Sequence, residues 1–253
     1  MSYARVLDRL EHRGSFERTA APRDLSKLEG IKTLLRDLGH PEQGFQVVHV
    51  AGTNGKGLTS TMLARGLQHE GFRTGCYTSP HLADIRERIT LDGKWVSQQA
   101  FAHNAKAVLD LSESYGDEPY LSYFDLLTAS ALLAFREAGC QWVVLETGIG
   151  GRADSTNVTE KTLTLLTRVG LDHQAVLGNT LEQIAVEKLG ITRPGVPLVS
   201  AEQAPELVPW LERECQMLGV PLTCTTTDSE TLLPEVSVTV SVIEHSTELG
   251  GSC

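Results

Sequence analysis

The chain has 253 residues, a hydrophobic fraction of 41% and a formal net charge of −10, from 22 basic and 32 acidic residues. This length fits one large α/β domain or two small ones, with enough apolar residues for an ordinary core. Proteins that bind nucleic acids or anionic membranes carry a basic patch, so the acidic balance argues against both kinds of partner. No apolar run approaches the ~18 residues of a membrane span.

The cysteines predict a reducing compartment. There are five, at positions 76, 140, 215, 224 and 253, which is an odd number without C-x-x-C spacing. Such a set is typical of free thiols in a cytosolic protein. The N-terminus has no signal-peptide pattern. We therefore expect a soluble, cytoplasmic protein.

Hydrophobic periodicity predicts alternating helices and strands along the chain. Helices are expected at 3–10, 25–38, 59–71, 97–111, 123–137, 180–189 and 205–218. Strands are expected at 46–51, 73–77, 141–146, 163–169 and 196–200, with a hairpin at 88–96 around an Asp-Gly turn. Strands that alternate with helices indicate an α/β fold with a doubly wound, mainly parallel sheet. This domain spans residues 1–224, whereas 225–253 are unplaced: a linker, disorder or the start of a missing C-terminal domain.

A glycine-rich loop between the first strand and the following helix predicts a phosphate-binding P-loop. Its residues are Gly52, Thr53, Asn54, Gly55, Lys56 and Gly57, and Thr59 follows in the helix. Glycines let backbone N–H groups converge on an anion, and the helix N-terminus adds positive charge there. Lys56 supplies a full charge for the terminal phosphates. The spacing departs from G-x-x-x-x-G-K-[ST], so an ordinary βα turn is the alternative.

Three polar side chains follow other strands of the predicted sheet. Glu146 ends one strand, Ser79 comes after another, and His173 comes after a third. Ligands of parallel sheets sit beyond the carboxyl ends of the strands, where a carboxylate can bind Mg²⁺ or its waters. The alternatives are a satisfied strand-end acid and a structural histidine. Taken alone, Lys188 beside Gly190 is better interpreted as an ordinary lysine at a helix end.

Five motifs together resemble a known family. They are GTNGKG at 52–57, TSPHL at 78–82 with ERI at 87–89, ETGIGGRADSTN at 146–157, GLDH at 170–173 and EKLGI at 187–191. Their order and spacing are similar to those of folylpolyglutamate synthase/dihydrofolate synthase, in the Mur-ligase-like group of ATP-dependent amide ligases. The resemblance covers about residues 3–223. It implies a fold like the Mur-ligase central domain.

The resemblance also implies substrates, cofactors and site residues. ATP would bind the 52–57 loop, and Mg²⁺ would be held through Ser79, Glu146, His173 and a carbamylated Lys188. Catalytic roles would fall to Lys56, His173 and Lys188. The folate or dihydropteroate site would involve Ser79, Pro80, His81, Phe124 and Asp154, with an aromatic face suited to a flat pterin. L-glutamate would be joined to the folate carboxylate through an acyl phosphate.

Two departures from the family limit this prediction. Leu58 stands where the family has Ser or Thr, and Thr59 points about 100° away around the helix. Family members also carry a second, C-terminal α/β domain. We therefore expect a chain that folds and binds Mg–ATP weakly but makes little amide bond alone. A catalytically inactive Mg–ATP-binding module is the alternative, and the TSPHL and GGRADSTN segments disfavour an unrelated hydrolytic NTPase.

Overall fold

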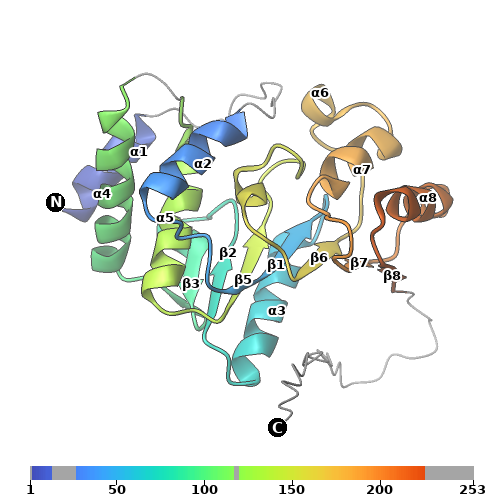
Figure 1. Cartoon of the computed structure of the whole chain (residues 1–253), viewed down its shortest axis with the longest axis horizontal. Coiled ribbons are helices and arrows are strands. Elements are labelled where there is room, and N and C mark those ends of the chain that lie inside the picture. The colour runs from blue at the N-terminus through green and yellow to red at the C-terminus, as the bar shows by residue number, and fades with distance from the viewer. Residues whose placement is uncertain (1, 13–26, 117–119, 226–253) are drawn as a thin grey trace, which may run out of the picture.

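One sheet organises the protein (Figure 1). The computed structural model describes residues 2–12, 27–116 and 120–225. Within them the strand order is β4-β3-β2-β5-β1-β6-β7-β8. The strands are β1 (Gln46–Ala51), β2 (Thr74–Tyr77), β3 (Ile89–Leu91), β4 (Lys94–Trp95), β5 (Trp142–Glu146), β6 (Leu163–Leu166), β7 (Leu198–Ser200) and β8 (Leu222–Cys224). In this spatial order the strands β2, β5, β1, β6, β7 and β8 pair in parallel. Strands β3 and β4 form an antiparallel edge beside β2. The predicted mainly parallel α/β fold is confirmed.

Helices cover both faces of this sheet (Figure 1). They are α1 (Tyr3–Glu11), α2 (Lys27–Asp37), α3 (Lys56–His69), α4 (Gln98–Ser114), α5 (Tyr123–Glu137), α6 (Gln174–Leu177), α7 (Leu181–Leu189) and α8 (Val208–Leu218), with 3₁₀ turns η1 (Ile85–Arg88) and η2 (Ser155–Val158). Because side chains alternate between the two faces of a strand, β1 contributes residues to two hydrophobic cores. Val48 and Val50 pack in the core under α3, whereas Val47 joins the core that contains α5.

Local sequence signals explain the element boundaries. The Ser97 and Thr180 side chains accept hydrogen bonds from the first turns of α4 and α7. Ser122 and Asp125 form a reciprocal capping box at the start of α5. Asp92 and Gly93 both have positive φ angles, 46° and 70°, as a two-residue hairpin turn with the favoured twist requires.

Several predicted boundaries were wrong. Helix α3 begins at Lys56, three residues before the predicted start, because Gly55 adopts a left-handed conformation at its N-cap. Strand β6 ends at Leu166, since the chain then turns toward the glycine loop. Helix α8 begins at Val208, with Pro209 in its first turn, and β8 was not predicted. The prediction for 225–253 lies outside the described residues except for Thr225.

Gly75 on β2 gives a direct test of the packing between sheet and helix. A Cβ built on Gly75 would lie 2.4 Å from Cδ1 of Phe135, a buried residue of α5. We expect Gly75→Ala to lower the free energy of unfolding by about 1–3 kcal/mol through overpacking. Gly66→Ala on α3 is the matched control, since nothing lies within 4 Å of its Cβ position; it should stabilise by up to ~1 kcal/mol. Urea unfolding measures both, and a Gly75→Ala protein as stable as wild type would contradict this packing.

Candidate functional site

The loops predicted to carry chemistry all leave the same edge of the sheet. Strands β1, β2, β5 and β6 run parallel, so their carboxyl ends lie together (Figure 1). Val50 of β1 pairs with Glu146 of β5, and Thr147 N donates to Val50 O at 3.0 Å. The glycine loop and the Glu146 carboxylate are therefore neighbours at the position where ligands of such sheets bind.

The glycine loop is held open at the N-terminus of α3. Gly55 has φ 85° and no side chain caps the helix, so its first N–H groups have no side-chain acceptor. The other end of the loop is fastened to the segment after β6. Thr53 N donates to Arg168 O at 3.1 Å, and Thr53 Oγ1 both donates to Gly170 O and accepts from Gly170 N. This geometry suits an anion at the helix end.

Gly52 is required at the start of this loop. Its φ is +148°, and a Cβ there would lie 1.8 Å from Oγ1 of Thr167. No side chain fits in this space without moving the backbone of the loop or of the segment after β6. The close approach is what brings the glycine loop against the residues that follow β6.

Glu146 faces the glycine loop from β5. Its side chain is 3% exposed, and Oε2 accepts from Ser79 N at 2.9 Å. The same oxygen lies 3.3 Å from the place that a Cβ would take on Gly57. Burial raises the pKa of the Glu146 carboxyl, while the Ser79 N–H and the charge of Lys56 act in the opposite direction. A carboxylate in this position gains stability from a bound cation.

Two lysines lie over the carbonyl groups of the loop. Lys56 Nζ donates to Thr53 O at 3.4 Å, and Lys188 Nζ donates to Gly52 O at 2.6 Å. Burial, and next the charge of Lys56, lower the pKa of Lys188 to about 8. At pH 7 roughly a tenth of such an amine is neutral, compared with well under a thousandth of an ordinary lysine. Lys188 therefore has a nucleophilic amine close to the glycine loop.

The two predicted histidines contact Asp172 and Arg88, and the charge of Arg88 also acts on Glu146. His173 caps α6 with φ 47°, and its exposed ring lies 3.6 Å from the carboxylate of Asp172. His81 Nδ1 accepts from Nε of the buried Arg88 at 2.9 Å, next to the exposed Pro80. The structure thus places Lys56, Ser79, Glu146 and Lys188 around the loop. Roles for His173 and His81 in metal or substrate binding stay predictions.

Phe124 and Asp154 lie beneath the loop that follows β5. Asp154 is fully buried, and its Oδ2 accepts from Gly148 N at 3.0 Å and Ile149 N at 3.2 Å. The Phe124 ring is 2% exposed and lies 5.9 Å from the Tyr77 ring. Neither presents an open face, so in this structure both support the loop from below. Their contact with a substrate stays a prediction.

Two supporting residues were not predicted to have a role. The Glu87 carboxylate accepts from the backbone N–H groups of Leu82, Ala83 and Asp84 and so holds the loop after β2. Asn157 Nδ2 donates to Arg152 O and Gly190 O at 2.9 and 3.0 Å, joining η2 to the end of α7. The Asp84-x-x-Glu87 spacing is a capping-box signal. Nothing in the sequence marks the partners of Asn157.

The donor set at this edge fits magnesium better than a transition metal. Among the described residues, no group of three or more His, Cys, Asp or Glu side chains could hold a metal ion. Glu146 and the hydroxyl of Ser79 offer hard oxygen ligands beside a phosphate loop. Mg²⁺ is commonly held by one or two carboxylates together with substrate phosphates and waters, and these residues suit that arrangement.

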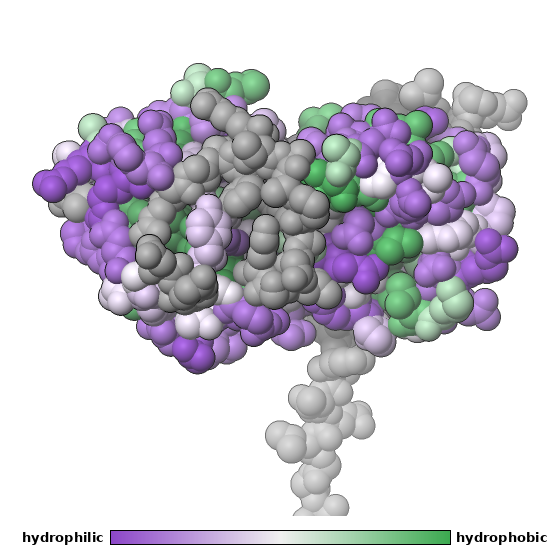
Figure 2. All heavy atoms as spheres, turned by 90° about the horizontal axis from the view of Figure 1, so that it is seen from above, coloured by the Kyte–Doolittle hydropathy of each residue, from purple (hydrophilic) through white to green (hydrophobic). Residues whose placement is uncertain are grey.

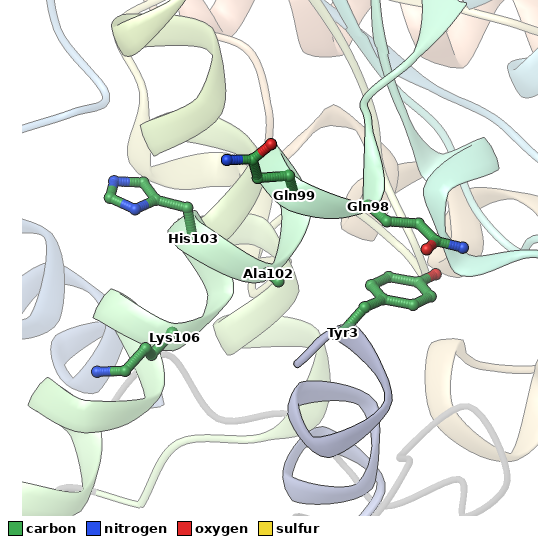
Figure 3. A pocket seen from close by; sticks show the side chains of 6 residues that line it. All are labelled: Tyr3, Gln98, Gln99, Ala102, His103 and Lys106. Atoms are coloured by element: carbon green, nitrogen blue, oxygen red, sulfur yellow. The ribbon is translucent and has the colours of Figure 1, made fainter. Parts of the chain in front are cut away.

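Two cavities among the described residues lie away from this edge. One, of about 490 Å³, is lined by Tyr3, Gln98, Gln99, Ala102, His103 and Lys106 (Figure 3). Figure 3 shows the side chains of His103 and Lys106 pointing away from Tyr3, whereas the Gln98 amide lies on the side of the Tyr3 hydroxyl. The surface seen from above in Figure 2 is mostly hydrophilic, with small separate hydrophobic patches. Neither feature competes with the glycine loop as the candidate site.

The mainly parallel sheet and its covering helices form an α/β domain of the Mur-ligase type. No protein-family model matches the sequence. The chain is 41% identical over 198 residues to the dihydrofolate synthase/folylpolyglutamate synthase of Bacillus subtilis, an alignment that covers 76% of this chain and 45% of that protein. The dihydrofolate synthetase of Saccharomyces cerevisiae is 36% identical over 203 residues, covering 78% and 47%.

Solved structures give the same result. The Mycobacterium tuberculosis folylpolyglutamate synthase complexed with ADP matches with a TM-score of 0.78 and 33% identity, covering 88% of this chain and 50% of that one. A folylpolyglutamate synthase–AMPPCP–folate complex matches with a TM-score of 0.79 and 32% identity, covering 88% and 54%. In sequence and fold the chain is similar to folylpolyglutamate synthase/dihydrofolate synthase, which confirms the resemblance of its motifs.

The matches leave part of each relative uncovered. The chain spans about half the length of the curated relatives that it matches. Within the described residues, no helix is long and apolar enough to cross a membrane.

Proposed function

We propose that this chain forms the nucleotide-binding part of an ATP-dependent ligase that joins L-glutamate to a folate or dihydropteroate carboxylate. The observation that carries the proposal is the close approach of the Glu146 carboxylate to the N-terminus of α3, with Lys56 and Lys188 bonded to carbonyls of the same loop. Relatives bound to ADP and to AMPPCP with folate support it.

ATP would lie with its phosphates on the 52–57 loop. The first N–H groups of α3 and the Lys56 ammonium would stabilise the negative charge of the terminal phosphates. Lys56 would exchange its long hydrogen bond to Thr53 O for a phosphate oxygen. Glu146 and Ser79 would hold Mg²⁺, which when bound would supply further charge neutralisation at the phosphates.

Two displacement steps would follow. An oxygen of the folate carboxylate attacks the γ-phosphorus, the bond to the β-phosphate oxygen breaks, and an acyl phosphate and ADP result. The amine of glutamate then attacks the acyl carbon, loses a proton and expels phosphate. These steps need no protein nucleophile, so the chain would contribute positioning and charge stabilisation.

Lys188 would act after carbamylation. Its lowered pKa of about 8 supplies the neutral amine that adds to CO₂. The product is a carboxylate-like ligand in place of an ammonium that would repel a metal ion by several kcal/mol at ~4 Å. Bicarbonate should therefore increase magnesium-dependent nucleotide binding.

An inactive Mg–ATP-binding module is the second candidate. Leu58 favours it, because this side chain is 69% exposed in the first turn of α3, where the family has a hydroxyl. Leucine cannot donate a hydrogen bond to phosphate or support a metal-bound water. The two candidates differ in whether an acceptor carboxylate promotes cleavage of ATP.

Trapping of the acyl phosphate separates these candidates. The purified chain is incubated with Mg–ATP and dihydropteroate, with and without hydroxylamine, and ADP and hydroxamate are measured. A ligase domain should form ADP and hydroxamate only when the acceptor is present. Mg–ATP binding without acceptor-dependent ADP would favour the module. We expect little glutamate-dependent phosphate release from the isolated chain, and vigorous release would contradict that expectation.

A further inference from the structure

Two basic side chains meet at one carbonyl group beneath η2. Lys161 is 7% exposed, and its Nζ donates to Asn157 O at 3.3 Å. Arg193 Nη2 approaches the same oxygen at 3.4 Å and donates to Asn157 Oδ1 at 3.0 Å. An ammonium and a guanidinium thus lie close together in a largely buried place. Neither belongs to the candidate nucleotide site.

No carboxylate forms an ion pair or hydrogen bond with Lys161 in the part of the chain that the structure describes. The exposed Glu160, its neighbour in sequence, raises the pKa of Lys161, but burial and the charge of Arg193 both lower it by more. Arg193 uses its other donors on the carbonyls of Gly190 and Thr192, at 3.2 and 2.8 Å. A buried ammonium beside a like charge and without an anion is unfavourable.

His49 adds an unsatisfied acceptor to this region. It is fully buried on β1, and its Nε2 lies 2.8 Å from Thr156 Oγ1. Thr156 Oγ1 donates its own hydrogen to Asp154 Oδ1 at 2.6 Å, so the Nε2 of His49 carries the proton of this contact. His49 Nδ1 is then a bare acceptor, and it has no hydrogen-bond partner among the described residues. Burial, and next the charges of Lys161 and Arg193, hold the pKa of His49 well below the usual range.

We propose that Lys161 is a carbamylation site, separate from Lys188, at which the buried amine reacts reversibly with CO₂. The lone pair of Nζ forms a bond to the carbon of CO₂, one C=O π bond becomes the carbamate anion, and a proton passes from Nζ to solvent. The product keeps one N–H for Asn157 O. Its negative charge lies beside the Arg193 guanidinium, where a charge-assisted pair replaces the repulsion of two cations.

The protonation of Lys161 favours this reaction. Burial, followed by the charge of Arg193, lowers its pKa to about 7. Roughly half of the amine is therefore neutral at pH 7, a larger share than for Lys188. Since CO₂ reacts only with the neutral amine, a larger fraction of Lys161 than of Lys188 is able to react at pH 7.

A carbamate here would stabilise the junction between η2 and α7. Asn157, which holds both Lys161 and Arg193, also bonds to Arg152 O and Gly190 O. An ion pair at Asn157 would strengthen the contact that places α7, and with it Lys188, against the glycine loop. CO₂ should therefore raise the melting temperature of the protein through Lys161.

Chemical trapping tests the proposal without any need for ligase activity. The full chain is equilibrated with ¹³C-bicarbonate, carbamates are alkylated with a trialkyloxonium salt, and peptides are analysed by mass spectrometry. We expect a bicarbonate-dependent mass increase on Lys161 at least tenfold above that on the exposed Lys94. We also expect bicarbonate to raise the melting temperature of wild type and of Lys94→Met, but not of Lys161→Met.

The outcomes separate this inference from the proposed function, on which it does not rest. A label on Lys188 alone would support the proposed metal site and overturn carbamylation of Lys161. A wild-type chain without label on Lys161 would overturn it even if Lys161→Met fails to fold. A thermal shift that sulfate reproduces without any label would show a noncovalent anion site in its place and would also overturn the proposal.

Discussion

Replacing Lys56 with methionine is expected to weaken Mg–ATP binding by roughly a thousandfold. An ammonium about 4 Å from a phosphate charge contributes ~4 kcal/mol at an effective dielectric constant of 20, and 1.4 kcal/mol corresponds to a factor of ten. Methionine keeps an unbranched apolar stem and removes the charge. Among the described residues the Lys56 side chain donates one hydrogen bond, at 3.4 Å, so its replacement should change the fold little. Calorimetric titration with Mg–ATP measures the effect.

Lys94→Met is the matched control for this variant. Lys94 is an exposed lysine on the edge strand β4, outside the glycine loop. Its replacement makes the same change in net charge but should leave the affinity for Mg–ATP within about twofold, since exposed charges beyond a Debye length are largely screened. Equal losses in both variants would mean that the nucleotide responds to the net charge of the protein and not to Lys56.

Glu146→Gln is expected to act in opposite directions on stability and on binding. Burial raises the pKa of the Glu146 carboxyl in the folded protein. The contribution of this group to stability is therefore fully present below its pKa in the unfolded chain, where it is protonated. That contribution is lost as the pH rises through the folded-state pKa, because the buried group then becomes charged. At neutral pH the buried charge is therefore unfavourable without a cation. Glutamine removes the charge, and its amide oxygen can still accept from Ser79 N. The variant should be more stable than wild type at pH 7.

Binding should change the other way. Without the carboxylate, the factor by which Mg²⁺ increases the affinity for ATP should fall by at least about tenfold. This is the lower end of the roughly 10–100-fold loss of metal affinity that follows removal of a group that supports a metal ligand. Urea unfolding at pH 4 and pH 7, and ATP titration with and without Mg²⁺, measure the two effects. Glu29→Gln, on the exposed surface of α2, controls for the loss of a surface charge. An unchanged magnesium dependence in Glu146→Gln would remove Glu146 from the metal site.

The sequence predicts this site well where the signal is local or follows from strand direction. Gly52 and Gly55 have the backbone angles that their residue type suggested. Glu146 and Ser79 meet because β5 and β2 are parallel and end at one edge. Lys188 reaches the loop from a helix far along the chain, and only the order of the motifs indicated this.

Other parts depend on tertiary packing that no short pattern encodes. Phe124 has the residue type of a pterin platform, but its ring is covered by neighbours in the core. The sequence does not show that the Asp154 carboxylate has partners, yet its oxygens accept hydrogen bonds from Gly148, Ile149 and Thr156. His173 follows a strand as predicted, but a left-handed turn at this residue leaves its ring exposed. Burial and backbone direction decided these positions.

Titration of ATP into the wild-type chain, with Mg²⁺ and with a chelator, tests whether the phosphates bind on the 52–57 loop and the metal at Glu146. We expect saturable binding to a single site, with an affinity that falls when Mg²⁺ is removed. Absence of saturable binding under both conditions, or equal affinity in both, would contradict this expectation.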